Sequence, residues 1–349
     1  MEELSRMTLE EIAKEIGISR TTIYKVLRNK GRVSDRTRNI VNEALEKYHY
    51  VQNKNARNLA MNRQYNIGYI GFKSKSANYF SKAMNDGIRR AVKEFGDDGL
   101  AMLISEFDVE NPKGQLEAVD EMLELGVKDF ILAYSHDDIM QQILDKLKEK
   151  KCQTVLLSRD YKENEQGYYV GVDYDKSGRL AAELLGKMLP GGGEIFIPVS
   201  REYETNRDIK SRLQGFLDKM KEYKDITVLP VRHGLLEEEE IYAQVVAKVK
   251  ENPQLVGIFD LTYRLDVISR ALKDRKREDI KLVGFDLFDE IREYVEDSTI
   301  DAVVYQDLNQ QAYQAVKILF DEMCYGKRNQ QHKFYAKLEV IMKENIQYF

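Results

Sequence analysis

A short basic segment near the start of the chain carries side chains that can recognise the edges of base pairs. Arginine can bridge O6 and N7 of guanine, and threonine can contact a base or a thymine methyl group. The candidate residues for DNA contact in and around this segment are Thr8, Ser19, Arg20, Thr21, Thr22, Tyr24, Lys25 and Arg28. We predict that this segment is a helix whose first turn enters the major groove.

Three helices are expected to position this segment. Thr8 and Glu11 have the spacing of a capping box, and apolar residues follow at helical intervals. Gly17 ends the first helix, because glycine tolerates the left-handed conformation of a tight turn. Ser19 and Ser34 cap the next two helices. Their predicted apolar residues are Ile23, Val26, Leu27, Ile40, Val41, Ala44, Leu45 and Tyr48. The pattern predicts a helix-turn-helix, and an ordinary three-helix bundle with surface Arg and Lys is the alternative.

The charge of the chain is unevenly distributed. Residues 1–63 hold 13 Lys and Arg against 8 Asp and Glu, a net charge of +5. The whole chain carries −5, so residues 64–349 carry −10. A basic head followed by an acidic body indicates that only the head meets a polyanion.

The composition excludes several classes of protein. The 349 residues are 43% hydrophobic and 32% charged, which is sufficient for a core and excludes a wholly disordered chain. No apolar run reaches the ~18 residues of a membrane span, and the acidic, amphipathic start is unlike a secretory leader. Cys152 and Cys324 do not make a disulfide framework. We expect a cytoplasmic protein with no membrane association.

The body alternates short apolar strands with amphipathic helices. The strands are expected at 67–72, 100–107, 129–134, 153–158, 169–173, 194–199, 226–231, 255–260, 280–285 and 300–306. The helices are expected at 80–95, 114–125, 137–150, 175–189, 206–221, 236–251, 264–275 and 308–325. Near-continuous apolar strands between helices make parallel sheets with right-handed crossovers. The predicted fold is an all-α helix-turn-helix head and an α/β body of two doubly wound parallel-sheet lobes.

Polar side chains at strand ends and in first helical turns are candidates for binding a ligand between the lobes. They are Phe80, Arg159, Asp160, Arg212, Asp260, Asp286 and Gln306. Carboxylates accept hydrogen bonds from hydroxyls, arginine donates to them, and aromatic rings stack on apolar sugar faces, so this set favours a sugar or polyol. The ordinary alternatives are a helix cap for Asp286, a surface position for Arg212 and a core position for Phe80.

Signals for other chemistry are weak. Gly191-Gly192-Gly193 lacks the Lys-Ser/Thr of a phosphate-binding loop, the four histidines show no metal spacing, and no G-x-S-x-G occurs. We therefore predict no metal, no cofactor and no enzymatic activity.

Residues 7–72 resemble the N-terminal part of the lactose-repressor (LacI/GalR) family of bacterial transcription regulators. The matching stretches are TLEEIAKEIGISRTTIYKVL, GRVSDRTRNIVNEALEKYHYV and NKNARNLA before IGYIGF, and the likeness extends more loosely along the chain. The resemblance implies a body with the type I periplasmic-binding-protein fold. Tyr24-Lys25 stands where the family usually has Ser-Arg, and Gln52 stands where it usually has Pro.

The resemblance also implies a division of the chain. The expected parts are a helix-turn-helix domain at 1–50, a hinge at 51–63 and an effector-binding and dimerisation domain at 64–349. The expected N-lobe is 64–173 plus 305–333, and the expected C-lobe is 174–304 plus 334–349.

The hinge is implied to order when two copies pack together on DNA. Asn53, a DNA-binding candidate, can cap the hinge helix. Asn55, Ala56 and Arg57 would then line the minor groove or contact its phosphates, and Leu59 would enter a base step and kink the duplex. A Leu59 that is simply packed on the body is the alternative.

The function implied is a homodimeric transcription regulator, first of all a repressor, bound to double-stranded operator DNA. In SRLQGF and LVGFD, Arg212 and Asp286 match the ligand-binding positions of the family. A small sugar-like effector would control operator affinity, as inducer or as co-repressor. A cytoplasmic sugar-binding protein and a doubly wound α/β enzyme are the alternatives, although the enzyme would need a nucleotide fingerprint or phosphate loop.

Overall fold

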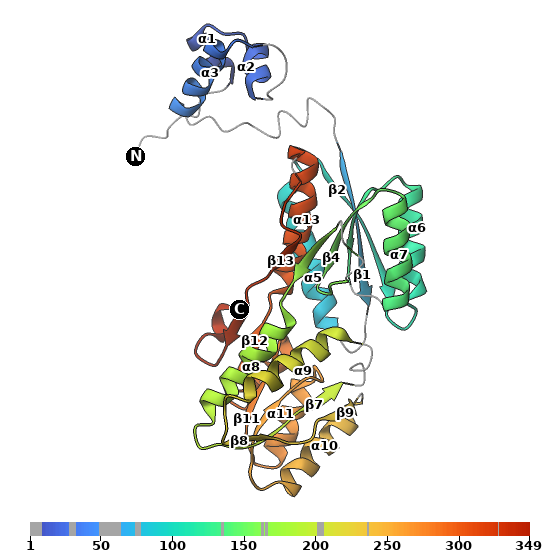
Figure 1. The fold of residues 1–349 in the computed structure, drawn as a ribbon, viewed down its shortest axis with the longest axis vertical. Coiled ribbons are helices and arrows are strands. Elements are labelled where there is room, and N and C mark those ends of the chain that lie inside the picture. The colour runs from blue at the N-terminus through green and yellow to red at the C-terminus, as the bar shows by residue number, and fades with distance from the viewer. Residues whose placement is uncertain are drawn as a thin grey trace. The chain divides into compact units, whose positions relative to one another are not determined.

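The computed structural model of the chain describes residues 9–27, 33–48, 64–73, 78–133, 136–161, 164, 167–200, 206–235, 237–326 and 328–349. The chain divides into two units, residues 1–63 and 64–349, and each is considered separately (Figure 1). Within these described ranges, no helix is both long and apolar enough to span a bilayer.

The first unit contains three short helices, α1 (Leu9–Ile16), α2 (Arg20–Leu27) and α3 (Asp35–Lys47). Ile12, Ile23 and Val41 are fully buried between them. Gly17 turns the chain between α1 and α2 with a φ of +65°, as a left-handed turn requires. Ile40, which was expected in the core, is 38% exposed, because the buried stripe of α3 runs through Val41 and Ala44 instead.

Ser34 caps α3, and its replacement is expected to loosen the first unit. The Ser34 hydroxyl accepts a hydrogen bond from the Thr37 backbone N–H at 3.2 Å and pairs with the Thr37 hydroxyl at 2.8 Å. Loss of such a cap costs about 1 kcal/mol. Ser34→Ala should therefore speed hydrogen exchange of the α3 amides about five-fold in the full chain. Ser34→Thr, which keeps the acceptor, is the matched control, and equal exchange rates in the two variants would contradict the assignment.

The N-lobe of the second unit is a six-stranded parallel sheet in the order β13-β5-β4-β3-β1-β2. Its strands are β1 (Tyr65–Lys73), β2 (Leu100–Asp108), β3 (Asp129–Leu132), β4 (Gln153–Leu157), β5 (Tyr168–Gly171) and β13 (Lys333–Tyr335). Its helices are α5 (Asn78–Phe95), α6 (Lys113–Glu124), α7 (Asp137–Glu149) and α13 (Leu308–Tyr325). Figure 1 shows α5 and α13 on one face of the sheet and α6 and α7 on the other.

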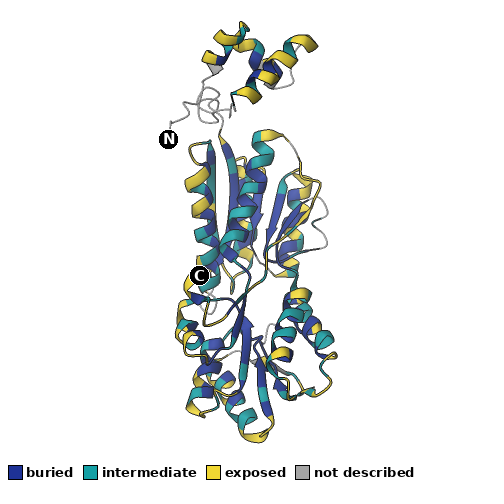
Figure 2. Cartoon of the chain, turned by 90° about the vertical axis from the view of Figure 1, so that its left-hand side faces the viewer, coloured by how far each residue is buried: buried dark blue, intermediate teal, exposed yellow. Residues whose placement is uncertain are grey.

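The C-lobe has a second six-stranded sheet in the order β14-β12-β11-β10-β6-β8, parallel except for its edge strand β14. The strands are β6 (Gly193–Phe196), β8 (Ile226–Val228), β10 (Leu255–Phe259), β11 (Lys281–Phe285), β12 (Ala302–Tyr305) and β14 (Glu339–Ile341). Its helices are α8 (Tyr174–Met188), α9 (Arg207–Met220), α10 (Glu238–Glu251), α11 (Leu265–Asp274) and α12 (Arg292–Glu296), with 3-10 turns at Asp289–Ile291 and Ile346–Tyr348. One apolar core joins α8 and α9 to the sheet, and another joins α10, α11 and α12 to it. The sheets are therefore buried between helical layers (Figure 2).

The predicted fold class is confirmed, with several local differences. The strand expected at 194–199 is divided into β6 and β7 (Pro198–Ser200), and β7 pairs with β9 (Arg232–Leu235) in a small parallel sheet. The strands β9, β13 and β14 and the helix α12 were not predicted. They are only three to five residues long, so they are too short to show a hydrophobic period.

Candidate functional site

The chain passes between the lobes at residues 172–173, 306–307 and 336–338, and the ends of several strands meet there. Four residues that follow the ends of β4, β10, β11 and β12 have left-handed backbone conformations. They are Ser158, Tyr263, Asp286 and Asp307, with φ of 72°, 61°, 62° and 47°. Such conformations cost about 1–3 kcal/mol each and are found at binding sites and switch regions. Four of the seven non-glycine residues with a positive φ in the described parts of the chain therefore lie where the lobes face one another.

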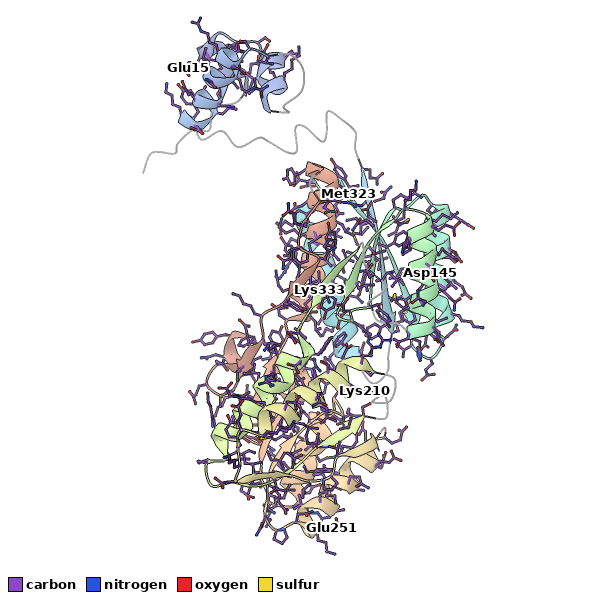
Figure 3. The ribbon with its side chains drawn as sticks, in the orientation of Figure 1. Glu15, Asp145, Lys210, Glu251, Met323 and Lys333 are labelled. Atoms are coloured by element: carbon purple, nitrogen blue, oxygen red, sulfur yellow. The ribbon has the colours of Figure 1, made fainter. Side chains whose placement is uncertain are left out.

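Arg212 is placed in this region by the close contact of α8 and α9. Asn206 caps α9 by accepting hydrogen bonds from the backbone N–H groups of Asp208 and Ile209 at 3.0 and 3.2 Å. A Cβ atom at Gly178 would lie 1.9 Å from the Arg212 carbonyl oxygen, so only glycine permits this approach. Lys210, labelled in Figure 3, lies in the first turn of α9.

Gly178→Ala is accordingly expected to separate α8 from α9 and displace Arg212. The added methyl group meets backbone, which cannot rotate away as a flexible side chain can. We expect about 1–3 kcal/mol of destabilisation, measured by urea unfolding of the full chain. Gly191→Ala is the control, because a Cβ there meets nothing within 4 Å. Equal stability of the two variants would show that the helices do not approach so closely.

The Arg212 guanidinium is buried and makes hydrogen bonds in three directions. It donates to the Ser177 hydroxyl at 3.2 Å, to the Tyr263 hydroxyl at 3.3 Å and to Gln306 Oε1 at 2.9 Å. Its carbon lies 3.9 Å from the centre of the Phe285 ring and 4.8 Å from that of Tyr174. Arginine is therefore held as a fixed, planar donor rather than as a surface charge.

Asp286 and Gln306 continue this network. Gln306 Nε2 donates to Asp286 Oδ2 at 2.8 Å, while the buried Asp286 Oδ1 has no hydrogen-bond partner. Burial raises the pKa of Asp286 to about 6, against the opposing effects of Arg212 and of the Gln306 amide. A buried oxygen without a partner costs about 1–3 kcal/mol. A ligand hydroxyl that donated to Oδ1 would remove that cost.

Arg159 and Asp160 follow β4 but lie in different surroundings. The buried Arg159 side chain donates to Asp208 Oδ2 at 2.9 Å, which ties the N-lobe to the first turn of α9. Burial raises the pKa of Asp208, although the guanidinium of Arg159 lowers it. Asp160 instead pairs at 2.5 Å with Lys333, which is labelled in Figure 3, so the structure does not bring Asp160 into the Arg212 network.

Asp260 is buried after β10, but its carboxylate bonds to its own loop. Oδ1 accepts from the Thr262 N–H at 2.7 Å and from its hydroxyl at 2.6 Å, and Oδ2 accepts from the Arg264 N–H at 3.2 Å. Burial raises the pKa of Asp260 to about 6, and these hydrogen bonds oppose the rise. The structure therefore gives Asp260 the role of holding the loop that presents Tyr263.

The aromatic residue at the opening of the cleft is Tyr79 rather than Phe80. Phe80 packs on the N-lobe core, with its ring centre 5.8 Å from that of Phe72. Tyr79 reaches across to the C-lobe, where its ring stacks on Phe288 with centres 4.5 Å apart and planes 20° apart. A cavity of about 520 Å³ lies beside this pair. Phe80 is therefore a core residue next to the cleft.

The sequence pointed to the segment that holds Tyr79, although Phe80 was selected from it. Three other polar or aromatic residues of the site were missed, Tyr174, Ser177 and Tyr263. The pattern around Ser177 did mark the start of the C-lobe, but nothing in the sequence indicated that its hydroxyl faces Arg212. Across the part of the chain that is described, no group of three His, Cys, Asp or Glu residues is arranged to hold a metal ion.

The candidate DNA-contacting surface lies on the first unit. Ser19, Arg20, Thr21 and Lys25 are exposed at or in α2, whereas Thr22 is half-buried and its hydroxyl pairs with that of Ser19 at 2.9 Å. Tyr24 lies in the same helix. Thr8, Arg28 and the hinge candidates Asn53, Asn55, Ala56, Arg57 and Leu59 lie outside the described residues.

Comparisons with known proteins agree with both units. Residues 8–53 match the family "Bacterial regulatory proteins, lacI family", and residues 45–328 match "Periplasmic binding protein domain". The chain is 23% identical over 322 residues to the HTH-type transcriptional repressor PurR of Pasteurella multocida, across 90% of this chain and 92% of that protein. It is 25% identical over 272 residues to a D-apiose import binding protein of Paraburkholderia graminis, across 77% and 85% of the two chains.

A solved structure supports the same fold. GanP, a glucose-galactose binding protein from Geobacillus stearothermophilus, superimposes with a TM-score of 0.68 at 20% identity. The superposition covers 81% of this chain and 99% of that protein. This likeness concerns the two-lobed body.

Proposed function

This chain belongs to the lacI family of bacterial regulatory proteins, and we propose that it is a repressor whose operator affinity is set by a small saccharide bound between its lobes. The observation that carries the ligand site is the buried network of Arg212, Gln306 and Asp286, in which Asp286 Oδ1 lacks a partner. It presents fixed donors and an unused acceptor together, which is the combination that hydroxyl groups require. The D-apiose import binding protein supports a saccharide as the ligand class.

The proposed ligand residues are those that the structure brings together. Arg212, Asp286 and Gln306 would bond to the ligand, and Arg159 would hold α9 through Asp208. Asp260 would act through the position of Tyr263, and Phe80 and Asp160 are left out of the site. We assign no catalytic step and no cofactor to these residues.

The proposed DNA-bound form is a homodimer in the cytoplasm. Two first units would bind the half-sites of a near-palindromic operator, because twofold protein symmetry requires twofold DNA symmetry. A ligand must prefer one arrangement of the lobes to change operator affinity. A coupling free energy of ~1–3 kcal/mol changes that affinity about 5–150-fold. The hinge, with Leu59 as the residue proposed to enter the minor groove, would transmit the change.

Arg20→Ala is expected to weaken recognition of one base pair in each half-site. Arg20 is exposed in the first turn of α2, where a bidentate contact with guanine contributes ~1–3 kcal/mol of discrimination. Binding to a library of operator variants should lose its preference at that position. Lys14→Ala on α1 is the control for removing an exposed cation from the same unit. An unchanged preference at every position would contradict this role for Arg20.

A thermal-shift screen with a carbohydrate panel tests the saccharide directly. A ligand that binds only the native state at a concentration of 100 Kd stabilises it by about 2.7 kcal/mol. We expect at least one saccharide to raise the melting temperature of the wild-type protein but not that of Asp286→Asn. A panel without any shift, or a shift that Asp286→Asn retains, would contradict the site.

A further inference from the structure

A cavity lies between the lobes beside the Arg212 network, and Arg212, Asp286 and Gln306 are not among its lining residues. Its volume is about 520 Å³, and residues of both lobes line it. The N-lobe contributes the N-terminal part of α5. The C-lobe contributes the loops after β10 and β11, the starts of α10 and α11, and the 3-10 turn at Asp289–Ile291. The space is therefore a half-open groove lined by both lobes.

The cavity adjoins the Arg212 network at Tyr263 and next to Asp286 in the chain. Tyr263 lines the cavity, and its hydroxyl accepts a hydrogen bond from Arg212 Nη1 at 3.3 Å. Leu287 and Phe288 line it as well, and they follow Asp286 directly in the chain. A ligand unit bound to Asp286 would thus have its outward side at the cavity.

The size and the aromatic lining suit a further sugar unit. The volume lies within the ~300–1,000 Å³ of pockets that hold drug-sized ligands, which are larger than one sugar ring. Tyr79 and Phe288 stack on one another at its wall, and Tyr263 adds a third ring. Aromatic rings present large apolar surfaces with few rotatable bonds.

The charge of the lining selects against anions. Its charged residues are Asp86, Glu238, Asp266, Asp289 and Glu290 against Lys82 and Arg264. Arg264 already pairs with Asp266 at 2.8 Å and with Glu238. A phosphate or uronate group would therefore meet an excess of carboxylates, whereas an uncharged sugar would not.

We infer that this cavity is an outer subsite for the second unit of an uncharged di- or oligosaccharide whose terminal unit binds at Arg212 and Asp286. The inference rests on the proposed function, because it needs a saccharide in the inner site. It identifies the effector as a chain of at least two neutral sugar units rather than a monosaccharide or a sugar phosphate.

Titration calorimetry with matched pairs of sugars tests this subsite on the full chain. The pairs are glucose with maltose and cellobiose, xylose with xylobiose, and galactose with β-1,4-galactobiose, and glucose 6-phosphate is the anionic probe. We expect at least one disaccharide to bind ten-fold or more tightly than its monosaccharide, and glucose 6-phosphate not to bind.

Phe288→Ala tests whether the tighter binding of the disaccharide depends on the cavity. It should reduce the ratio of monosaccharide to disaccharide Kd to within about three-fold of one, whatever the two absolute values are. Tyr348→Ala removes an aromatic ring that is 79% exposed elsewhere on the C-lobe, and it should leave the ratio unchanged. If Phe288→Ala has the same ratio of monosaccharide to disaccharide Kd as the wild type, the outer subsite is overturned.

The remaining outcomes separate this inference from the proposed function. Monosaccharides that bind in an Asp286-dependent way as tightly as their disaccharides would overturn the outer subsite alone. Tight binding of glucose 6-phosphate would overturn the selection for uncharged ligands. If no saccharide of either length binds, the proposed function fails together with the inference.

Discussion

Arg212→Met is expected to abolish the response to saccharide while operator binding persists. The substitution removes three hydrogen bonds and leaves Asp286 buried without its nearby cation. Removing one partner from a buried charged network costs about 3–5 kcal/mol, much of it as an unpaired charge. The saccharide-induced rise in melting temperature and the change in operator affinity should both disappear, since the ligand loses its main donor.

Two further variants make this result interpretable. Lys221→Met removes a cation from the end of α9 whose side chain is 75% exposed, and it should respond as the wild type does. Arg212→Lys keeps the charge but loses the planar fork, so it should fold and still bind saccharide at least ten-fold more weakly. If Arg212→Lys binds saccharide with the affinity of the wild type, the ligand does not bind at Arg212.

Asp286→Asn is expected to change how stability depends on pH. Burial raises the pKa of Asp286 from 3.8 to about 6. Well below pH 3.8, the carboxyl is protonated in both the folded and the unfolded chain. As the pH rises toward 6, the unfolded chain releases its proton first, so the folded state loses stability until Asp286 also ionises. The loss amounts to about 3 kcal/mol, and asparagine does not undergo it.

Urea unfolding at several pH values measures this effect. The stability of Asp286→Asn relative to the wild type should increase by about 2–3 kcal/mol between pH 4 and pH 7 and stay constant above pH 7. Asp260, whose pKa is also about 6, titrates in both proteins, so its contribution cancels in the difference. If the free energy of unfolding depends on pH in the same way in both proteins, burial does not raise the pKa of Asp286.

Features fixed by local sequence were predictable. Gly17 and Ser34 act through turns and caps of a few residues, and both take the predicted roles in the structure. Arg212 and Asp286 were selected because one lies in a helix after a strand and the other ends a strand. The parallel sheet brings strand ends to one edge, so their meeting followed from the fold.

Features that depend on contacts between the lobes were not predictable. Whether Tyr79 or Phe80 points to the C-lobe depends on how the first turn of α5 is rotated against a distant part of the chain.

Asp260 was chosen as a strand-end carboxylate, although the Asp-x-Thr sequence is typical of a carboxylate that bonds to its own turn. Local hydrogen bonds such as these compete with ligand binding and show no signal in the hydrophobic pattern.

Selection of duplexes from a random library, followed by titration of the best sequence with and without saccharide, measures both operator recognition and its control by the ligand. We expect a near-palindromic site bound at least 10³-fold more tightly than random DNA at physiological salt. We also expect the saccharide identified by calorimetry to change that affinity by about 5–150-fold, and Arg212→Met to remove the change. A protein that binds every duplex equally, or whose site preference is unaffected by any ligand of the cleft, would contradict the proposed function.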